Sequence, residues 1–214
     1  MRRPRNRDWM EFRIARHERA DSLTLARLAH TSDEELDALT TPDARRFYNM
    51  AREVASDCHL TISYIRFKLY KDRVLWAEAK PKHKVEDMVM NWLRQRYKHF
   101  GLVLFTQRGV FACWPGGDLA RFPVTKAQGE VLEETACHVP EKAIWWDDQG
   151  DGLWDTFYNS QYISSRKNLP LFYKTMPKYY LENFSGLSTE RRRVENGTLD
   201  AYTVSYTHLR AHET

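Results

Sequence analysis

Basic and aromatic side chains alternate between residues 64 and 70, where Tyr64, Arg66, Lys68 and Tyr70 occupy every second position. In a β-strand every second side chain points to the same face of the sheet, so these four would lie together. Aromatic rings can stack on nucleic-acid bases while cations bind phosphates. The pattern therefore indicates a nucleic-acid platform, although alternation of this kind is also typical of a solvated outer sheet face.

A second group of basic and aromatic residues lies nearer the C-terminus and comprises Arg166, Asn168, Lys174, Lys178 and Tyr180. The segment between residues 161 and 193 contains seven basic residues and only two acidic residues. Pro177 favours a helix start, whose backbone N–H groups beside Lys178 would suit a phosphate. The alternative is structural: Arg166 and Asn168 would end a helix, and the aromatic residues would pack on a sheet.

Two histidines flank the first predicted hairpin, with His59 before it and His83 after it. Antiparallel strands could bring them together as an acid–base pair. The alternative is a histidine at a helix end and another at a helix start. No third ligand is evident, so we predict no metal site. The sequence also has no Gly-rich phosphate loop, G-x-S-x-G or C-x-x-C motif, and we predict no cofactor.

The N-terminal elements that must position these residues are helices. Helical periodicity covers residues 9–29, with a break near residues 21–22. Ser32 and Glu35 form a capping-box pattern, and Thr41 with Pro42 predicts the start of a longer helix. Along that helix one face is apolar and carries Phe47, Ala51, Val54 and Cys58.

Strand patterns begin at residue 61. We expect a hairpin of residues 61–70 and 74–80 with a turn at Lys71-Asp72, and a two-residue loop would pair Leu69 with Val74. A helix over 84–98 and strands over 102–108, 110–114 and 119–124 follow, then helices over 152–165 and 177–183. Residues 126–140 fit either helix or loop. This order predicts an α+β fold, an antiparallel β-sheet with helices packed on one face and a C-terminal helical segment.

The overall composition is that of a globular chain, with 42% hydrophobic and 29% charged residues. The net charge of +4 permits a nucleic-acid partner without requiring one. Three scattered cysteines predict a reducing, cytoplasmic compartment. No apolar run reaches the about 18–20 residues that a membrane span needs, so we predict no membrane association.

Four regions are expected along the chain. Residues 1–40 form an N-terminal helical segment that begins like a truncated start, and residues 41–186 form the α+β domain. Residues 187–203 are a polar linker. Residues 204–214 read like a translated frame of a sequencing adaptor, so we exclude their histidines from the search for sites.

Several motifs between residues 43 and 186 resemble a bacterial domain of unknown function that is associated with DNA repair or DNA metabolism. The motifs are His59 followed by Arg66-Phe67, then Pro81-x-His83-x-Val85, Leu153-Trp154-x-x-Phe157-Tyr158, Ile163-x-x-Arg166-x-Asn168 and Met176-Pro177-Lys178-x-Tyr180. That family occurs alone or fused to a uracil-DNA glycosylase-like domain, and it is associated with a radical-SAM protein. The resemblance implies DNA and one of these proteins as partners.

Three hypotheses follow. The leading one is an accessory nucleic-acid-binding domain for DNA repair or base modification, which leaves the chemistry to its partner. The second is an enzyme acting on DNA with a site around His59, Arg66 and His83. The third is a scaffold that binds a protein through aromatic surfaces. The sequence leaves open whether the domain is an enzyme, and it names neither a lesion nor a preferred strand form.

Overall fold

The structure is a computed structural model that describes residues 7–140, 170–171, 174 and 178–184. The chain forms two compact units, residues 1–141 and 142–214, and each is described by itself. The described part of the first unit begins with four helices, which are α1 (Arg7–Ile14), α2 (Ser22–His30), α3 (Asp33–Ala38) and α4 (Pro42–Tyr64).

Local capping residues set where these helices begin. The Asp21 side chain accepts a hydrogen bond from Thr24 N at 2.7 Å and starts α2, which confirms the predicted break after α1. Ser32 and Glu35 form the predicted capping box at α3. At α4, Thr41 caps the first turn and Pro42 occupies it. These side chains satisfy backbone N–H groups that a helix start otherwise leaves unpaired.

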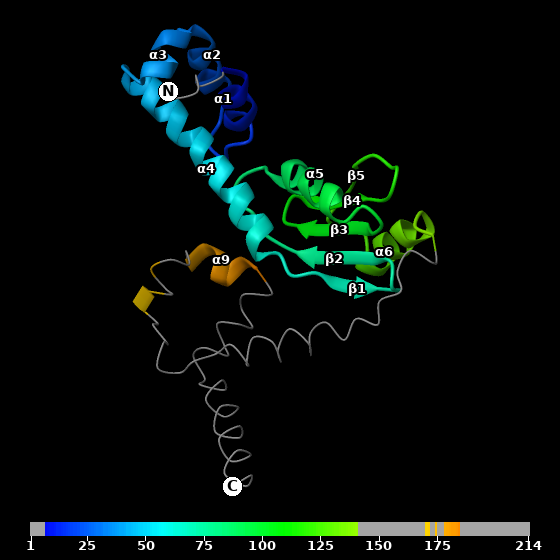
Figure 1. The fold of residues 1–214 in the computed structure, drawn as a ribbon. Helices are drawn as coiled ribbons and strands as arrows, with labels where there is room; N and C mark the ends of the chain where they lie inside the picture. Colours follow the sequence, from blue (N-terminus) through cyan, green and yellow to red (C-terminus); the bar gives the residue numbers. More distant parts are fainter. Residues whose placement is uncertain (1–6, 141–169, 172–173, 175–177, 185–214) are drawn as a thin grey trace, which may run out of the picture. The chain divides into compact units, whose positions relative to one another are not determined.

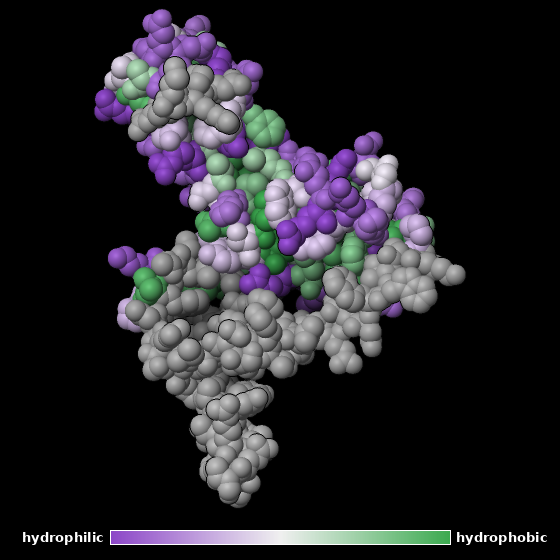
Figure 2. All heavy atoms as spheres, viewed as in Figure 1, coloured by the Kyte–Doolittle hydropathy of each residue, from purple (hydrophilic) through white to green (hydrophobic). Residues whose placement is uncertain are grey.

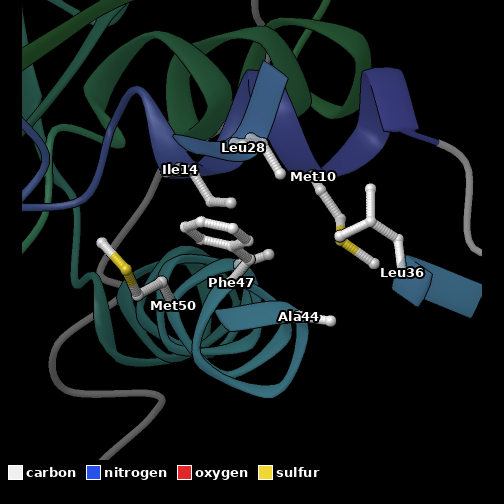
Figure 3. Close-up of a cluster of buried hydrophobic side chains, with 8 residues drawn as sticks. Met10, Ile14, Leu28, Leu36, Ala44, Phe47 and Met50 are labelled. Carbon is white, nitrogen blue, oxygen red and sulfur yellow. The ribbon is translucent and has the colours of Figure 1, made fainter. Parts of the chain in front are cut away.

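Helices α1, α2 and α3 gather around the N-terminal half of α4 (Figure 1). Their core is apolar, and Figure 3 shows the Phe47 ring pointing from α4 towards Ile14 of α1. Met10, Leu28 and Leu36 complete it with no exposed surface. Burial of each such side chain stabilises the fold by about 1.5–3 kcal/mol. In Figure 2 hydrophilic residues cover most of the visible surface of these helices, as expected for amphipathic helices around one core.

A five-stranded sheet follows in the order β1-β2-β3-β4-β5. Its strands are β1 (Lys68–Tyr70), β2 (Val74–Glu78), β3 (Gly101–Thr106), β4 (Gly109–Cys113) and β5 (Ala120–Phe122). Neighbouring strands are antiparallel except β2 and β3, which are parallel. Helix α5 (Glu86–Arg96) connects that parallel pair, because parallel neighbours need a crossover, and α6 (Gln128–Cys137) follows β5. The predicted α+β class with a mostly antiparallel sheet is confirmed.

The helices cover both faces of the sheet, which corrects the expectation of one face. On one face, Val103 and Val110 cluster with Val131 of α6. Alternate residues of the same strands point the other way, where Thr106 Oγ1 lies 3.5 Å from Glu86 Oε1 of α5. Helix α5 connects β2 to β3 inside the sheet, whereas α6 follows the edge strand β5. The two helices can therefore pack on opposite faces of the sheet.

The predicted strand over residues 61–70 is mostly wrong. Helix α4 continues to Tyr64, and β1 begins only at Lys68. The β-branched Thr61 and Ile62 favour a strand locally. Buried residues nevertheless keep helical spacing through Val54, Cys58 and Thr61, so packing against the rest of the fold overrides local preference. Tyr64 and Arg66 therefore do not share a strand face with Lys68.

The hairpin register also differs by one residue from the prediction. Tyr70 pairs with Val74 and Lys68 with Trp76, across a three-residue connection. Lys71 and Asp72 form the predicted turn, and both have positive φ, but the Arg73 carbonyl accepts a hydrogen bond from Gly101 N at 2.9 Å. Arg73 therefore contributes to the junction with β3 and not to the β1–β2 ladder.

In the second unit, α9 (Lys178–Asn183) confirms the predicted short helix after Pro177. Tyr180 and Leu181 are its buried residues. The predicted helix over 152–165, with Arg166 and Asn168 just after it, lies outside the described residues. Among the described helices, none has the length and apolarity that would let it cross a membrane.

Candidate functional site: a buried histidine pair and an arginine-lined pocket

Two histidines from distant parts of the sequence pack against each other inside the first unit, with their ring planes tilted by 31°. His17, between α1 and α2, and His83, just before α5, are each only 1% exposed, and their ring centroids lie 4.4 Å apart. The predicted ring partner of His83 was His59. That residue is instead exposed on α4, where its carbonyl accepts a hydrogen bond from Ser63 Oγ. The partner of His83 is therefore one that no sequence motif indicated.

A network of hydrogen bonds fixes the loop that carries His83. Asp57 Oδ2 of α4 accepts from His83 N at 2.7 Å. Arg108, in the turn between β3 and β4, donates to the carbonyls of Pro81 at 2.8 Å and of His83. The Arg108 guanidinium is neutralised by buried Glu86 at 2.6 Å. The motif Pro81-x-His83-x-Val85 is thus a clamped loop that orients one ring.

The loop that carries His17 is joined to the same region. Lys84 N donates to the Arg16 carbonyl at 2.9 Å, and the Arg16 guanidinium pairs with Asp87 at 2.5 Å. These bonds hold the end of α1 against the start of α5, and so bring the two rings together.

The hydrogen bonds also assign the tautomer of each ring. Arg19 N donates to His17 Nδ1 at 3.1 Å, and Glu18 N donates to His83 Nδ1 at 3.2 Å. A neutral ring whose Nδ1 accepts carries its proton on Nε2. His17 Nε2 therefore donates to Glu53 Oε2 at 3.1 Å, and this bond lowers the pKa of Glu53. Burial, with a smaller effect from neighbouring His17, lowers the pKa of His83 and favours its neutral form.

A metal ion could be held by the side chains of His17, Glu53 and His83. Two histidines and one glutamate are the protein ligands of some catalytic zinc sites. The ligand atoms of the three side chains lie within 4.8 Å of one another. A metal-bound histidine, however, usually donates its other ring N–H to a carboxylate or a carbonyl. Here backbone N–H groups face both Nδ1 atoms, so a metal on Nε2 would cost two hydrogen bonds. The arrangement favours a hydrogen-bonded pair over a metal centre.

His17 also lines a pocket of about 470 Å³ between the His17–Arg19 loop and α4. Its polar lining is His17, Arg19, Arg45, Arg46, Asn49 and Glu53. Arg45 Nε donates to the Leu39 carbonyl at 2.9 Å, which anchors that guanidinium. Arg46 forms no hydrogen bond within the described ranges. Three guanidinium groups against one carboxylate make this pocket suited to an anion, and arginine binds phosphate with two parallel hydrogen bonds.

A second pocket, of about 260 Å³, lies where α5 ends beside the turn between β4 and β5. Its lining includes Tyr97, Phe100 and Trp114 together with Arg94 and Lys98. Sequence reasoning placed Trp114 in a strand and the others in a helix or after it, and did not bring them together. Their meeting depends on the packing of α5 against β4.

The residues predicted to bind nucleic acid from the first unit are partly dispersed. Tyr64 ends α4, and Arg66 Nη1 donates to the Ser63 carbonyl at 3.2 Å in the loop before β1. Lys68 lies on β1, with its Nζ 4.8 Å from the centre of the Trp76 ring. Tyr70 lies on the same face of β1 as Lys68, and its hydroxyl donates to Glu133 Oε1 at 2.5 Å, so two of the four predicted residues share a strand face.

The predicted residues of the second unit have separate surroundings. Lys174 is exposed, and Lys178 pairs with Glu182 at 3.6 Å on α9. Tyr180 is 7% exposed and packs against Phe184, with ring centroids 5.3 Å apart. A ring this deeply buried is not available for stacking on a base, so among these residues the lysines retain the stronger case for phosphate contact.

Comparison with known proteins gives one family match. No curated protein and no solved structure matches the chain significantly. Residues 18–185 match the family described as a domain of unknown function, DUF4130. The match begins well before residue 43, where the resemblance was expected to start, so α2 and α3 belong to the same domain as the sheet. The chain is a member of the DUF4130 family of domains of unknown function.

Proposed function

We propose that this domain binds DNA through the arginine-lined pocket, as an accessory module in DNA repair or base modification. The observation that supports the proposal is the pocket itself, in which Arg19, Arg45 and Arg46 surround a cavity with one carboxylate, Glu53. Phosphate contacts from arginine and lysine supply most of the affinity of sequence-independent DNA binding. A groove with excess positive charge is the feature that such binding requires.

The pocket has both fixed and adjustable donors. Arg45 is held by its bond to the Leu39 carbonyl, and Arg46 is exposed beside it on α4. Arg19 Nη2 lies 3.7 Å from Glu53 Oε2, an exposed and therefore weak ion pair. An incoming phosphate can replace Glu53 as the partner of Arg19 at small cost. Asn49 adds an amide donor on the same face of α4.

An accessory role agrees better with the chemistry of the histidines than a catalytic one. In the enzyme hypothesis, His83 would exchange protons near His59 and Arg66. His83 is instead only 1% exposed and its ring contacts His17, so a substrate cannot reach it, while His59 is exposed on α4. The reaction would then belong to a partner, and the resemblance described above suggests a uracil-DNA glycosylase-like domain or a radical-SAM protein.

The proposal is tested by fluorescence anisotropy of the full chain with labelled single- and double-stranded DNA over a salt series. An Arg19→Ala, Arg46→Ala double variant removes two pocket cations without touching the anchored Arg45. We expect weaker binding, and a slope of log K against log salt that flattens by about 0.7–0.9 for each lost phosphate contact. Arg27→Ala, which removes an exposed arginine of α2 outside the pocket, is the matched control.

Two results would count against the pocket. No binding at low salt would exclude DNA as a ligand of the chain and favour the protein-scaffold hypothesis. Binding that responds equally to the double variant and to Arg27→Ala would mean a diffuse electrostatic effect. Lys174→Ala with Lys178→Ala then tests the second unit, where loss of binding would move the DNA contact there.

A further inference from the structure

We propose that the second pocket binds an unpaired nucleotide of single-stranded DNA, with its base against aromatic rings and its phosphate against Arg94 and Lys98. The inference rests on the proposed DNA binding for the identity of the ligand, but it concerns different residues from those of the arginine-lined pocket. It predicts a preference for single-stranded over double-stranded DNA. The arginines cannot supply this preference, because phosphates are common to both forms.

The pocket combines three half-buried rings with two exposed cations. Tyr97 and Phe100 follow the end of α5, and Trp114 ends β4. Half-burial means that each ring is packed on one side and accessible on another. Base–aromatic stacking stabilises single-strand binding without regard to sequence, since every base has a flat face.

The rings are held in place before any ligand arrives. Trp114 stacks on His138 with ring centroids 4.2 Å apart and an interplanar angle of 15°. A Cβ atom at Gly117 would lie 2.2 Å from Trp114 Nε1, so a glycine is needed there for the indole to keep its place. Tyr97 meets Phe67 edge-on at 5.5 Å. Fixed rings lose little conformational entropy on binding, which favours affinity.

The charges of the pocket suit the phosphate of a nucleotide. Arg94 lies in the last turn of α5 and Lys98 follows two residues after the helix ends, and both line the pocket. Asp118 is the acidic residue of the lining, which leaves a positive balance. Cations at a helix end also offset the helix dipole, and that alone would explain them. The two cations lie beside three rings, and this combination indicates a planar ligand that carries a negative charge. An unpaired nucleotide is such a ligand, whereas the bases of a duplex are paired and their flat faces are not accessible.

The test compares a labelled single-stranded oligodeoxyadenylate with an oligonucleotide of equal length that carries abasic sites, so that only the bases differ. Binding to the full chain is measured by anisotropy. We expect the intact chain to prefer the base-containing strand by about 5- to 100-fold, the range that one stacked base produces. Trp114→Ala should abolish that preference. Trp92→Ala, which removes a 43% exposed tryptophan of α5 outside the pocket, should keep it.

Equal binding of the two strands by the intact chain would overturn the proposal, as would a preference that survives Trp114→Ala. If circular dichroism shows that Trp114→Ala is unfolded, Tyr97→Leu removes a different ring for the same test. The Arg19→Ala, Arg46→Ala variant separates the two proposals. This variant should weaken binding to both strands equally. An unchanged affinity with an intact base preference would refute DNA binding by the arginine-lined pocket and leave the proposal for the second pocket standing.

Discussion

The arginine-lined pocket in the helical part of the first unit and the second pocket in its sheet part are built in different ways. In the helical part, Arg45, Arg46, Asn49 and Glu53 come from two turns of α4, and a single loop adds His17 and Arg19. In the sheet part, the end of α5 meets the turn after β4, which lies some twenty residues further along the chain. The period of α4 sets one wall of the first pocket, whereas every wall of the second depends on contacts between elements that are distant in the sequence.

This difference separates an electrostatic site from a shape-dependent one. Side chains on the α4 face keep their spacing as long as the helix exists, and charge acts over several ångströms. Stacking in the sheet pocket requires ring positions accurate to fractions of an ångström. We therefore expect damage to either core to affect the base preference more than the overall affinity for phosphate.

The largest expected effect comes from the core of the helical part. Phe47→Ala removes a ring that is 1% exposed, and we expect a loss of about 3–5 kcal/mol in the free energy of unfolding. Urea denaturation followed by circular dichroism measures it. Leu23→Ala, at a residue 58% exposed on α2, is the control and should change stability by less than about 1 kcal/mol. Similar losses in both variants would mean that the core around Phe47 does not stabilise the unit.

A smaller effect is expected at the clamp by which Arg108 and Glu86 hold the His83 loop. Glu86→Gln leaves the Arg108 guanidinium without its counter-charge, beside carbonyls that it still binds. Because Arg108 is 26% exposed, we expect a loss of about 2–3 kcal/mol, below that of a fully buried pair. The same denaturation experiment applies, with Glu78→Gln on the exposed side of β2 as control. A Glu86→Gln variant as stable as the control would show that the ion pair between Glu86 and Arg108 does not stabilise the fold.

The smallest effect concerns pH and the buried His83. Burial lowers the pKa of His83 in the folded state, so below its ordinary pKa near 6.5 the unfolded chain binds a proton that the folded chain does not. Stability should fall as the pH drops from about 7 towards 5, by at most about 1.4 kcal/mol per pH unit. Unfolding curves at several pH values measure the slope.

The control for that slope is an exposed residue without a titratable side chain. His83→Gln should flatten the pH dependence, because glutamine has no proton to gain, whereas Asn91→Gln on α5 should leave it unchanged. Parallel profiles for the intact chain and His83→Gln would show that burial of His83 does not govern the acid response.

The sequence predicted most of the fold where local signals and packing agree. The capping residues Ser32 and Thr41 marked helix starts correctly, and the hairpin turn at Lys71-Asp72 was placed correctly. The prediction failed at residues 61–67, where β-branched residues suggested a strand but α4 continues to Tyr64 to bury Thr61. It also missed the parallel pairing of β2 and β3, because hydrophobic alternation does not distinguish strand direction.

For the candidate sites, the sequence by itself determined the clustering of Arg45 and Arg46 around Asn49, since residues three and four positions apart on a helix are neighbours. It also singled out His83 through its motif. Only the tertiary structure decided that His83 would pack against His17, that Glu53 would accept a hydrogen bond from His17, and that Trp114 would line the same pocket as Tyr97. These residues lie far apart along the chain, and no local period relates them. These contacts form because Arg108 holds the His83 loop in place and α5 packs on the sheet, which brings distant segments of the chain together.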